Sequence, residues 1–312
     1  MIASLHPHVL TTMAVVVAVL VVASVVSWTL RRIWPGKKLD EIRRRVQSWW
    51  VIVGIFFIAL ALNRTGSLIF FAFVSFLALK EFLSLIPTRR ADRRVLLLAY
   101  LSIPIQYYWV GIEWYGMFII FIPVYMLLII PGRMVLIGDT DGFLRSAGTL
   151  HWGLMMTVFS VSHVAFLLAL PTSVNPIGGG AALVLFLIVL TESNDVFQYL
   201  WGKSTGRRRV VPTVSPNKTW GGLIGGVGTT ILLGTLLASY LTPFTRREAL
   251  GAAALIGISG FIGDVVISAV KRDLGIKDSG SILPGHGGIL DRIDSLTYTA
   301  PLFFHYVRYL HG

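Results

Sequence analysis

Four aspartates stand at the borders of long apolar segments, where an ionisable side chain is costly to place in a membrane. They are Asp195, Asp264, Asp291 and Asp294. Asp291 and Asp294 are three residues apart, so a continuous helix would carry both on one face. Two acidic faces that meet across a narrow gap supply the hard oxygen ligands that Mg²⁺ prefers, with nucleotide phosphates completing its shell. The alternative for any single aspartate is an ion pair with a nearby arginine, which does not account for the set of four.

A stripe of polar side chains follows Asp264 along the same expected helix. Ser268, Lys271 and Arg272 recur at helical spacing after it, which places them on one face. In this stripe the carboxylate could bind a metal ion and the two cations could bind phosphates, which suits a metal-bound polyphosphate. A second basic stretch, residues 201–222, either receives phosphates or only reflects membrane topology, and its charge alone does not separate the two.

A glycine-rich loop, residues 277–288, reads KDSGSILPGHGG and is the best candidate for a phosphate cradle. Glycine allows backbone shapes closed to other residues, and exposed N–H groups bind phosphate oxygens. His286 in this loop is a candidate metal ligand, acid or base, or simply a polar loop residue, the last being the commonest role of such a histidine. Neither a Walker A sequence nor a Rossmann glycine pattern is present.

The elements that must position these residues are membrane helices. The chain is 55% hydrophobic and 13% charged, and its apolar residues form runs of about twenty, the length needed to span the hydrocarbon layer. The runs are continuous rather than alternating, so they predict helices and not barrel strands. The expected fold is an all-α polytopic bundle with about ten transmembrane helices. The expected spans are 10–30, 49–63, 67–87, 95–112, 114–131, 152–171, 179–199, 221–242, 249–270 and 293–311, the second being short enough to be re-entrant.

The formal charge of +12 is concentrated in alternate connections, which argues for topology rather than for nucleic-acid binding. By the positive-inside rule the connections rich in Lys and Arg are cytoplasmic, and both termini lie outside. The segment from Arg31 to Arg45 has attraction to anionic lipid headgroups as a second interpretation. No Lys or Arg precedes the first span, so we expect a permanent anchor rather than a cleaved signal. The absence of cysteine excludes disulfides and thiol chemistry.

The two halves of the chain differ in residue composition. Residues 1–175 have bulky spans and short basic connections, and they predict an N-terminal transmembrane scaffold. Residues 176–312 collect Gly, Asp, Lys and Ser at span ends, and they predict the transmembrane catalytic core. Overlapping G-x-x-x-G pairs begin at Gly221 and Gly222, and they favour close helix packing over ligand contact.

Three segments of the second half resemble the signature of the phosphatidate cytidylyltransferase (CDP-diacylglycerol synthase) family, nearly position for position. They are residues 268–272 (SAVKR), 277–280 (KDSG) and 283–294 (LPGHGGILDRID). Residues 215–220 (SPNKTW) and the pair Gly263-Asp264 are similar to two further motifs of the family. The resemblance covers about residues 180–312. The chain departs from the family pattern at Gly221, where Glu is usual, and at Gln198, where Ala is typical.

The resemblance implies transfer of a cytidylyl group from CTP to phosphatidic acid, giving CDP-diacylglycerol and pyrophosphate. It implies Mg²⁺ as cofactor and leaves a second cation open. Asp264 and Asp291 match the metal-binding aspartates of the family, and we add Asp294 to the expected metal ligands. The expected catalytic residues are Asp264, Asp291, Lys218, Lys271, Arg272 and His286. The expected substrate-binding residues are Ser215, Asn217, Ser268, Lys277, Asp278, Asp195, Gly287, Gly288 and Arg292.

Other functions remain open at this stage. A CTP-dependent lipid kinase, or a cytidylyltransferase for another anionic lipid, would use a similar site. A secondary transporter also carries buried acids and glycine-broken helices, but no inverted repeat is visible. A non-catalytic scaffold would not need so complete a motif. The expected location is a bacterial inner membrane with the site facing the cytoplasm, among membrane lipids, without nucleic acid, and with a homodimer left open.

Overall fold

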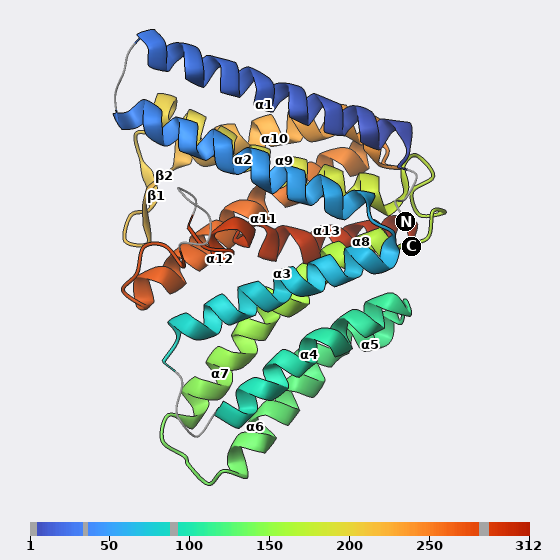
Figure 1. Ribbon diagram of the computed structural model, residues 1–312, viewed down its shortest axis with the longest axis vertical. Coiled ribbons are helices and arrows are strands. Elements are labelled where there is room, and N and C mark those ends of the chain that lie inside the picture. Colours follow the sequence, from blue (N-terminus) through green and yellow to red (C-terminus); the bar gives the residue numbers. More distant parts are fainter. Residues whose placement is uncertain (1–4, 34–36, 88–92, 281–286) are drawn as a thin grey trace.

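The computed structural model describes residues 5–33, 37–87, 93–280 and 287–312. The protein is an all-α membrane bundle whose rods lie roughly side by side (Figure 1). Within the described residues, eight helical runs are long and apolar enough to cross a membrane. Valines such as Val15, Val19 and Val22 are exposed on the outer surface, as expected for side chains that face lipid.

The first half of the chain forms eight α-helices and two wider π-helical turns among the described residues. Their bounds are α1 Pro7–Ile33, α2 Lys37–Ala61, α3 Arg64–Leu85, α4 Arg93–Gly111, α5 Tyr115–Ile120, η2 Phe121–Met126, α6 Leu127–Val135, α7 Phe143–Leu154, η3 Met155–Phe159 and α8 Ser160–Ala169. The runs α5–η2–α6 and α7–η3–α8 are each continuous and form one rod. Pro123 lies in η2 and has no N–H to donate, so a wider turn is expected there.

The second half contains the longest helices and a small hairpin. Its elements are α9 Gly179–Thr205, β1 Arg209–Val211, β2 Ser215–Thr219, α10 Trp220–Leu241, α11 Arg246–Asp273, α12 Leu290–Ile293 and α13 Leu296–His311. β1 and β2 pair antiparallel, with Arg209 opposite Thr219 and Val211 opposite Ser215. The stretch 201–222 is therefore a folded hairpin and helix ends rather than a loop.

The predicted spans correspond to the helical rods in number and order. Eight of the rods meet the length and hydropathy expected of a crossing helix, and α4 and α13 complete the set. The short second span is not re-entrant, because α2 extends back through polar residues to Lys37 and runs as a full helix beside α1 (Figure 1). The sixth expected span also begins earlier, at Phe143, because a polar helical turn precedes its apolar part.

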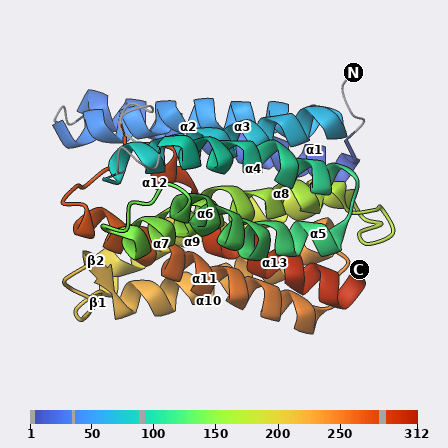
Figure 2. The ribbon, with the colours of Figure 1, turned by 90° about the horizontal axis from the view of Figure 1, so that it is seen from below.

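The chain places its polar loops and its two ends on opposite sides of the bundle. In two perpendicular views the β1–β2 hairpin and α12 lie toward one end, whereas N and C lie at the other (Figures 1 and 2). We call the first of these the hairpin end. The aspartates identified from sequence are carried by elements that reach toward it.

The two halves share one hydrophobic core. α13 packs against α8, and the ring of Phe304 from α13 meets the rings of Phe118 and Phe166 from the first half. Leu79 and Phe82 of α3 belong to the same buried cluster. The scaffold half is therefore packed directly against the half that carries the motifs.

Glycines allow the close approach of α9, α10 and α11, as their spacing predicts. A Cβ at Gly225 would overlap the Trp201 ring, and one at Gly226 would overlap Gln198. A Cβ at Gly263 would overlap the backbone carbonyl oxygen of Asp294. On α11, a Cβ at Gly257 would lie 3.4 Å from the Val227 Cα of α10. Small residues at these positions let the helix backbones approach closely.

Candidate active site

Lys218 is the centre of the first of two Lys–Asp pairs at the hairpin end. It lies on β2, one residue before Thr219, whose hydroxyl accepts a hydrogen bond from Gly222 N–H and begins α10. This turn from strand to helix directs Lys218 toward α9 and α11. The Lys218 Nζ lies 2.5 Å from Asp264 Oδ2 and donates to Gln198 Oε1 at 3.2 Å.

Electrostatics keeps Lys218 charged. Burial by itself would lower the pKa of Lys218, but the nearby carboxylates of Asp264 and Asp195 outweigh burial and raise that pKa above its ordinary value. The ammonium group also lies 5.6 Å from the centroid of the Phe261 ring. Lys218 is therefore a fixed cation, already desolvated in part, beside two acidic side chains.

Asp195 and Asp294 lie close to this pair. Asp195 Oδ2 accepts a hydrogen bond from the Ser295 hydroxyl at 2.9 Å, and Asp195 is within electrostatic range of Asp264 and Glu192. Asp294 is in turn within electrostatic range of Asp264 and Asp195. Acidic groups of α9, α11 and the residues just before α13 are therefore within electrostatic range of one another.

Asp291 forms the second Lys–Asp pair. Its Oδ1 accepts from Lys271 Nζ at 2.7 Å. Its Oδ2 accepts from Ser279 N–H at 2.9 Å and from Gly288 N–H at 3.0 Å, with the Ser279 hydroxyl also at 2.9 Å. Burial alone would raise the pKa of Asp291, but the hydrogen bonds from Lys271, Gly288 and Ser279 hold it below its ordinary value. Gly287 has φ +76°, and a Cβ there would overlap the Asp291 carboxylate.

The assigned helices are interrupted between Asp291 and Asp294. α12 ends at Ile293 and α13 begins only at Leu296, although the backbone of Asp294 and Ser295 keeps right-handed helical angles. Asp291 is held by Lys271, Ser279 and Gly288, and Asp294 is within electrostatic range of Asp264, Asp195 and Lys271. The shared face expected for the two aspartates stays a prediction.

Glu81, on α3 in the first half, reaches the same loop. Its Oε1 lies 2.5 Å from the Ser279 hydroxyl and accepts from Leu290 N–H at 3.1 Å, and its Oε2 accepts from Ile289 N–H at 2.8 Å. Only 7% of Glu81 is exposed. Ser279 thus lies between the carboxylates of Glu81 and Asp291.

A cavity of about 120 Å³ opens beside the Lys218 pair. Its lining includes Asp195, Gln198, Ser215, Asn217 and Lys218, which combines residues expected to bind substrate with the fixed cation. Asp195 Oδ1 and Gln198 Nε2 are buried and, within the described residues, have no hydrogen-bond partner. Such atoms are ready to accept or donate to a ligand.

The remaining predicted residues divide into those near the pairs and those away from them. The Ser268 hydroxyl donates to Asp264 Oδ1 at 3.3 Å, as the stripe on α11 predicts. Arg292 is within electrostatic range of Glu192. Arg272 is exposed and donates to the backbone carbonyl of Val214, and Lys277 and Asp278 are also exposed. His286 lies outside the described residues.

The donor set suits a divalent cation in its chemistry. Asp264, Asp291 and Asp294 offer hard oxygen atoms, and the unpartnered Oδ1 of Asp195 adds another. Among the described residues, no three His, Cys, Asp or Glu side chains already converge as a ready cluster of ligands. Asp264 and Asp291 are instead each paired with a lysine, Lys218 and Lys271 respectively.

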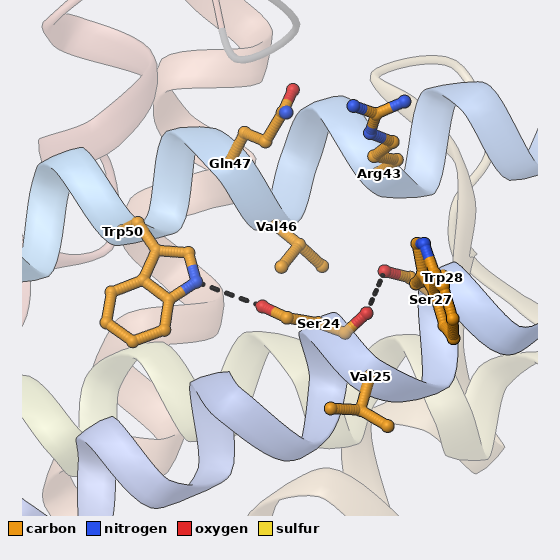
Figure 3. Close-up of a pocket in the computed structure, with 8 residues that line it drawn as sticks. All are labelled: Ser24, Val25, Ser27, Trp28, Arg43, Val46, Gln47 and Trp50. Atoms are coloured by element: carbon orange, nitrogen blue, oxygen red, sulfur yellow. Dashed lines mark hydrogen bonds between the residues drawn. The ribbon is translucent and has the colours of Figure 1, made fainter.

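A larger crevice, of about 490 Å³, lies elsewhere, between α1 and α2 (Figure 3). The indole N–H of Trp50 donates to the Ser24 hydroxyl at 3.0 Å across it, and Trp28 and Arg43 line its other side. Among the described residues, its lining contains no carboxylate.

Glu81 and Ser295 are the site residues that the sequence analysis missed. Ser295 follows the signature directly and carries no signal of its own. Glu81, by contrast, is an acidic residue within an otherwise apolar span, and such a residue is a functional candidate by default. The acidic residue in an apolar span was visible in the sequence, but it did not indicate which residues Glu81 contacts.

Comparison with known proteins places the chain in one family. The model of the cytidylyltransferase family matches residues 43–310. The "Uncharacterized protein YnbB" of Escherichia coli (strain K12) is 50% identical over 298 residues, which cover 96% of this chain and 98% of that protein.

Two phosphatidate cytidylyltransferases match shorter parts of the chain. The protein of Synechocystis sp. is 46% identical over 114 residues, 36% of this chain and 39% of that protein. The protein of Rickettsia bellii is 37% identical over 160 residues, 49% of this chain and 66% of that protein. Because the family match extends over most of the membrane bundle and both Lys–Asp pairs, the chain belongs to the cytidylyltransferase family and is a nucleotidyltransferase.

Proposed function

We propose that the protein is a phosphatidate cytidylyltransferase, which joins CTP and phosphatidic acid to give CDP-diacylglycerol and pyrophosphate. The observation that carries this proposal is the presence of two Lys–Asp pairs, Lys218–Asp264 and Lys271–Asp291, at one end of a membrane bundle. The lysines can bind the phosphates of a nucleotide, and the aspartates can bind its metal ion. A metal-bound nucleotide can therefore contact both members of each pair.

The reaction requires a phosphate oxygen of phosphatidic acid to attack the α-phosphorus of CTP. A new P–O bond forms there, and the bond from the α-phosphorus to the pyrophosphate oxygen breaks, so pyrophosphate leaves with the electron pair. Lys218 and Lys271 are placed to neutralise the phosphate oxygens throughout, which favours the charged transition state. Mg²⁺, held by Asp264, Asp291 and Asp294, would when bound neutralise further phosphate charge.

The Asp195 cavity is the proposed place for part of the nucleotide. Ser215 and Asn217 lie on its lining beside Lys218 and offer neutral hydrogen-bonding groups. The buried amide nitrogen of Gln198 has no partner within the described residues, so it is free to donate to a ligand. Gln198 also departs from the family pattern, which makes it a candidate for adapting this site.

The substrates come from two phases, which suits a site at the end of a membrane bundle. CTP is a polyanion and reaches the site from water, whereas phosphatidic acid keeps its acyl chains in the bilayer. The described ends of the helices that the Lys- and Arg-rich connections join lie toward the hairpin end (Figures 1 and 2), so we propose that this end faces the cytoplasm of a bacterial inner membrane.

The product test uses purified protein in lipid nanodiscs with Mg²⁺, phosphatidic acid and CTP labelled at the α-phosphate. We expect the label to enter a CDP-lipid with release of one pyrophosphate. A lipid kinase would leave the α-label in CDP and transfer only the γ-phosphate, which a parallel reaction with γ-labelled CTP detects. If label enters lipid only with another anionic acceptor, the phosphatidate assignment is wrong although cytidylyl transfer stands. Solute flux without nucleotide turnover would instead support a transporter.

The orientation test uses the absence of native cysteine. Ser204→Cys lies exposed at the hairpin end of α9, and Ser173→Cys lies exposed in the connection before α9 at the other end. In intact cells we expect a membrane-impermeant maleimide to label Cys at position 173 and to spare position 204, which it should label only in inverted vesicles. The reverse pattern would refute the cytoplasmic location of the site.

A further inference from the structure

We propose that Glu81 is a positioning residue, which holds the segment Gly287–Asp291 and Ser279 in the arrangement that the reaction requires. The expected loss of activity rests on the proposed function, whereas the expected loss of local structure does not. Glu81 belongs to the first half of the chain, for which the sequence indicated only a scaffold.

The carboxylate of Glu81 is an acceptor for three donors of the second half. These are the Ser279 hydroxyl at 2.5 Å, Ile289 N–H at 2.8 Å and Leu290 N–H at 3.1 Å. Ile289 and Leu290 begin α12, whose first N–H groups have no partner within that helix. Glu81 therefore supplies from another element the acceptors that α12 cannot supply itself.

Two glycines lie in close contact with this carboxylate. A Cβ at Gly288 would overlap both carboxylate oxygens of Glu81, and one at Gly280 would lie 3.1 Å from Oε2. The backbone at Gly280 and at Gly288 thus approaches Glu81 as closely as glycine permits. A contact of this kind depends on the acceptor being in one fixed place.

α3 is held by core packing where it carries Glu81. Phe82 is buried and packs against Trp152 with ring centroids 5.7 Å apart, and a Cβ at Gly153 would overlap the Phe82 ring. Leu79 and Leu83 are also buried beside it. The segment Gly287–Asp291, by contrast, begins with two glycines, and its N–H groups donate to Glu81 and Asp291. Glu81 is therefore the partner held by core packing in these hydrogen bonds, and this segment is the part that it positions.

The arrangement that Glu81 holds positions the hydrogen-bond donors to Asp291. Ser279 and Gly288 donate to Asp291 Oδ2, and the same two residues contact Glu81 on their other side. Loss of the Glu81 acceptors would release both donors and let Asp291 move relative to Lys271. A shift of about 1 Å in a catalytic group can cost on the order of 100-fold in rate.

The test compares Glu81→Ala with Glu113→Gln, which alters a carboxylate on an exposed ion pair with Arg64 away from the site. Hydrogen–deuterium exchange of nanodisc samples reports the amides of residues 287–291 directly, without any activity. We expect at least tenfold faster exchange there in Glu81→Ala, unchanged exchange in α9 and α13, and no change in Glu113→Gln. We also expect kcat to fall about 100-fold and the Mg²⁺ concentration for half-maximal rate to rise, because Asp291 is displaced.

A second variant keeps the idea testable if Glu81→Ala unfolds more widely. Gly288→Ala leaves the carboxylate in place but pushes against it, so we expect the same local increase in exchange. In the Glu81→Ala background the effect of Gly288→Ala should largely vanish, because the overlap that causes it is gone. Unchanged exchange in residues 287–291 of both single variants would overturn the proposal. Faster exchange in a protein whose wild type forms no CDP-lipid would leave the positioning role intact and refute only the proposed function.

Discussion

Asp264→Asn and Asp291→Asn should each lower kcat for CDP-lipid formation by about 1,000-fold, the effect of losing roughly 4 kcal/mol of transition-state stabilisation. Asparagine keeps the shape of the side chain but removes the charge that a divalent cation needs. Each substitution also leaves a half-buried lysine, Lys218 or Lys271, without its carboxylate partner. The measurement is the initial rate at limiting and at saturating Mg²⁺, and a partial recovery at high Mg²⁺ is expected.

Asp273→Asn is the matched control for these two variants. Asp273 is exposed on the last turn of α11, so it shares the helix of Asp264 and carries the same charge. We expect its rate to stay within twofold of wild type. If Asp264→Asn and Asp291→Asn also stayed within a few-fold at limiting Mg²⁺, neither aspartate would be a ligand of the catalytic metal.

Lys218→Ala should lower kcat/KM for CTP by about 100-fold, because Lys218 is a desolvated cation placed to contact phosphates in both ground and transition states. KM for CTP should rise and kcat should fall together. Lys218→Arg should recover little of the loss, since a planar guanidinium is larger than the ammonium that fits between Gln198 and Asp264. Steady-state kinetics and equilibrium CTP binding measure the two effects separately.

Lys203→Ala separates this specific role from the general effect of positive charge at the hairpin end. Lys203 is exposed near the end of α9 and faces water. Removing it changes net charge by the same amount as Lys218→Ala, so we expect only a small, salt-dependent change in CTP affinity. Equal losses in the two variants would show that charge alone, and not the Lys218–Asp264 pair, attracts the nucleotide.

The fold could be predicted almost completely because hydropathy reports directly on the bilayer. The order of the rods follows from the spacing of apolar runs, and the all-α class follows from the need to satisfy the backbone. The ends of helices were less accurate. α2 and the α7–η3–α8 rod extend through polar residues, and a hydropathy pattern does not register a helical turn made of polar side chains.

The site could be predicted as a set of residues but not as a set of contacts. Helical spacing related Asp264 to Ser268 correctly, because both lie on one regular helix. It could not pair Lys218 with Asp264, because that contact depends on a two-stranded hairpin that turns β2 toward α11. It also could not pair Lys271 with Asp291, because these residues lie on different elements, α11 and α12.

Glu81 was beyond reach for a different reason. The residue that it orders, Ser279, lies 198 positions later in the chain. No periodicity or motif spans such a distance, and a single buried carboxylate names no partner. Only the packing of α3 beside α12 reveals the connection.

That connection also limits how the chain can be recombined. A chimera that joins residues 176–312 to the first half of another family member would keep every signature residue and yet lose the contact, unless an acceptor of equal length stands where Glu81 does. We expect position 81 and the glycines at 280 and 288 to be inherited together, since a bulkier residue at either glycine is tolerable only with a shorter one on α3. The first half of the chain thus carries a constraint that the second half imposes through these contacts.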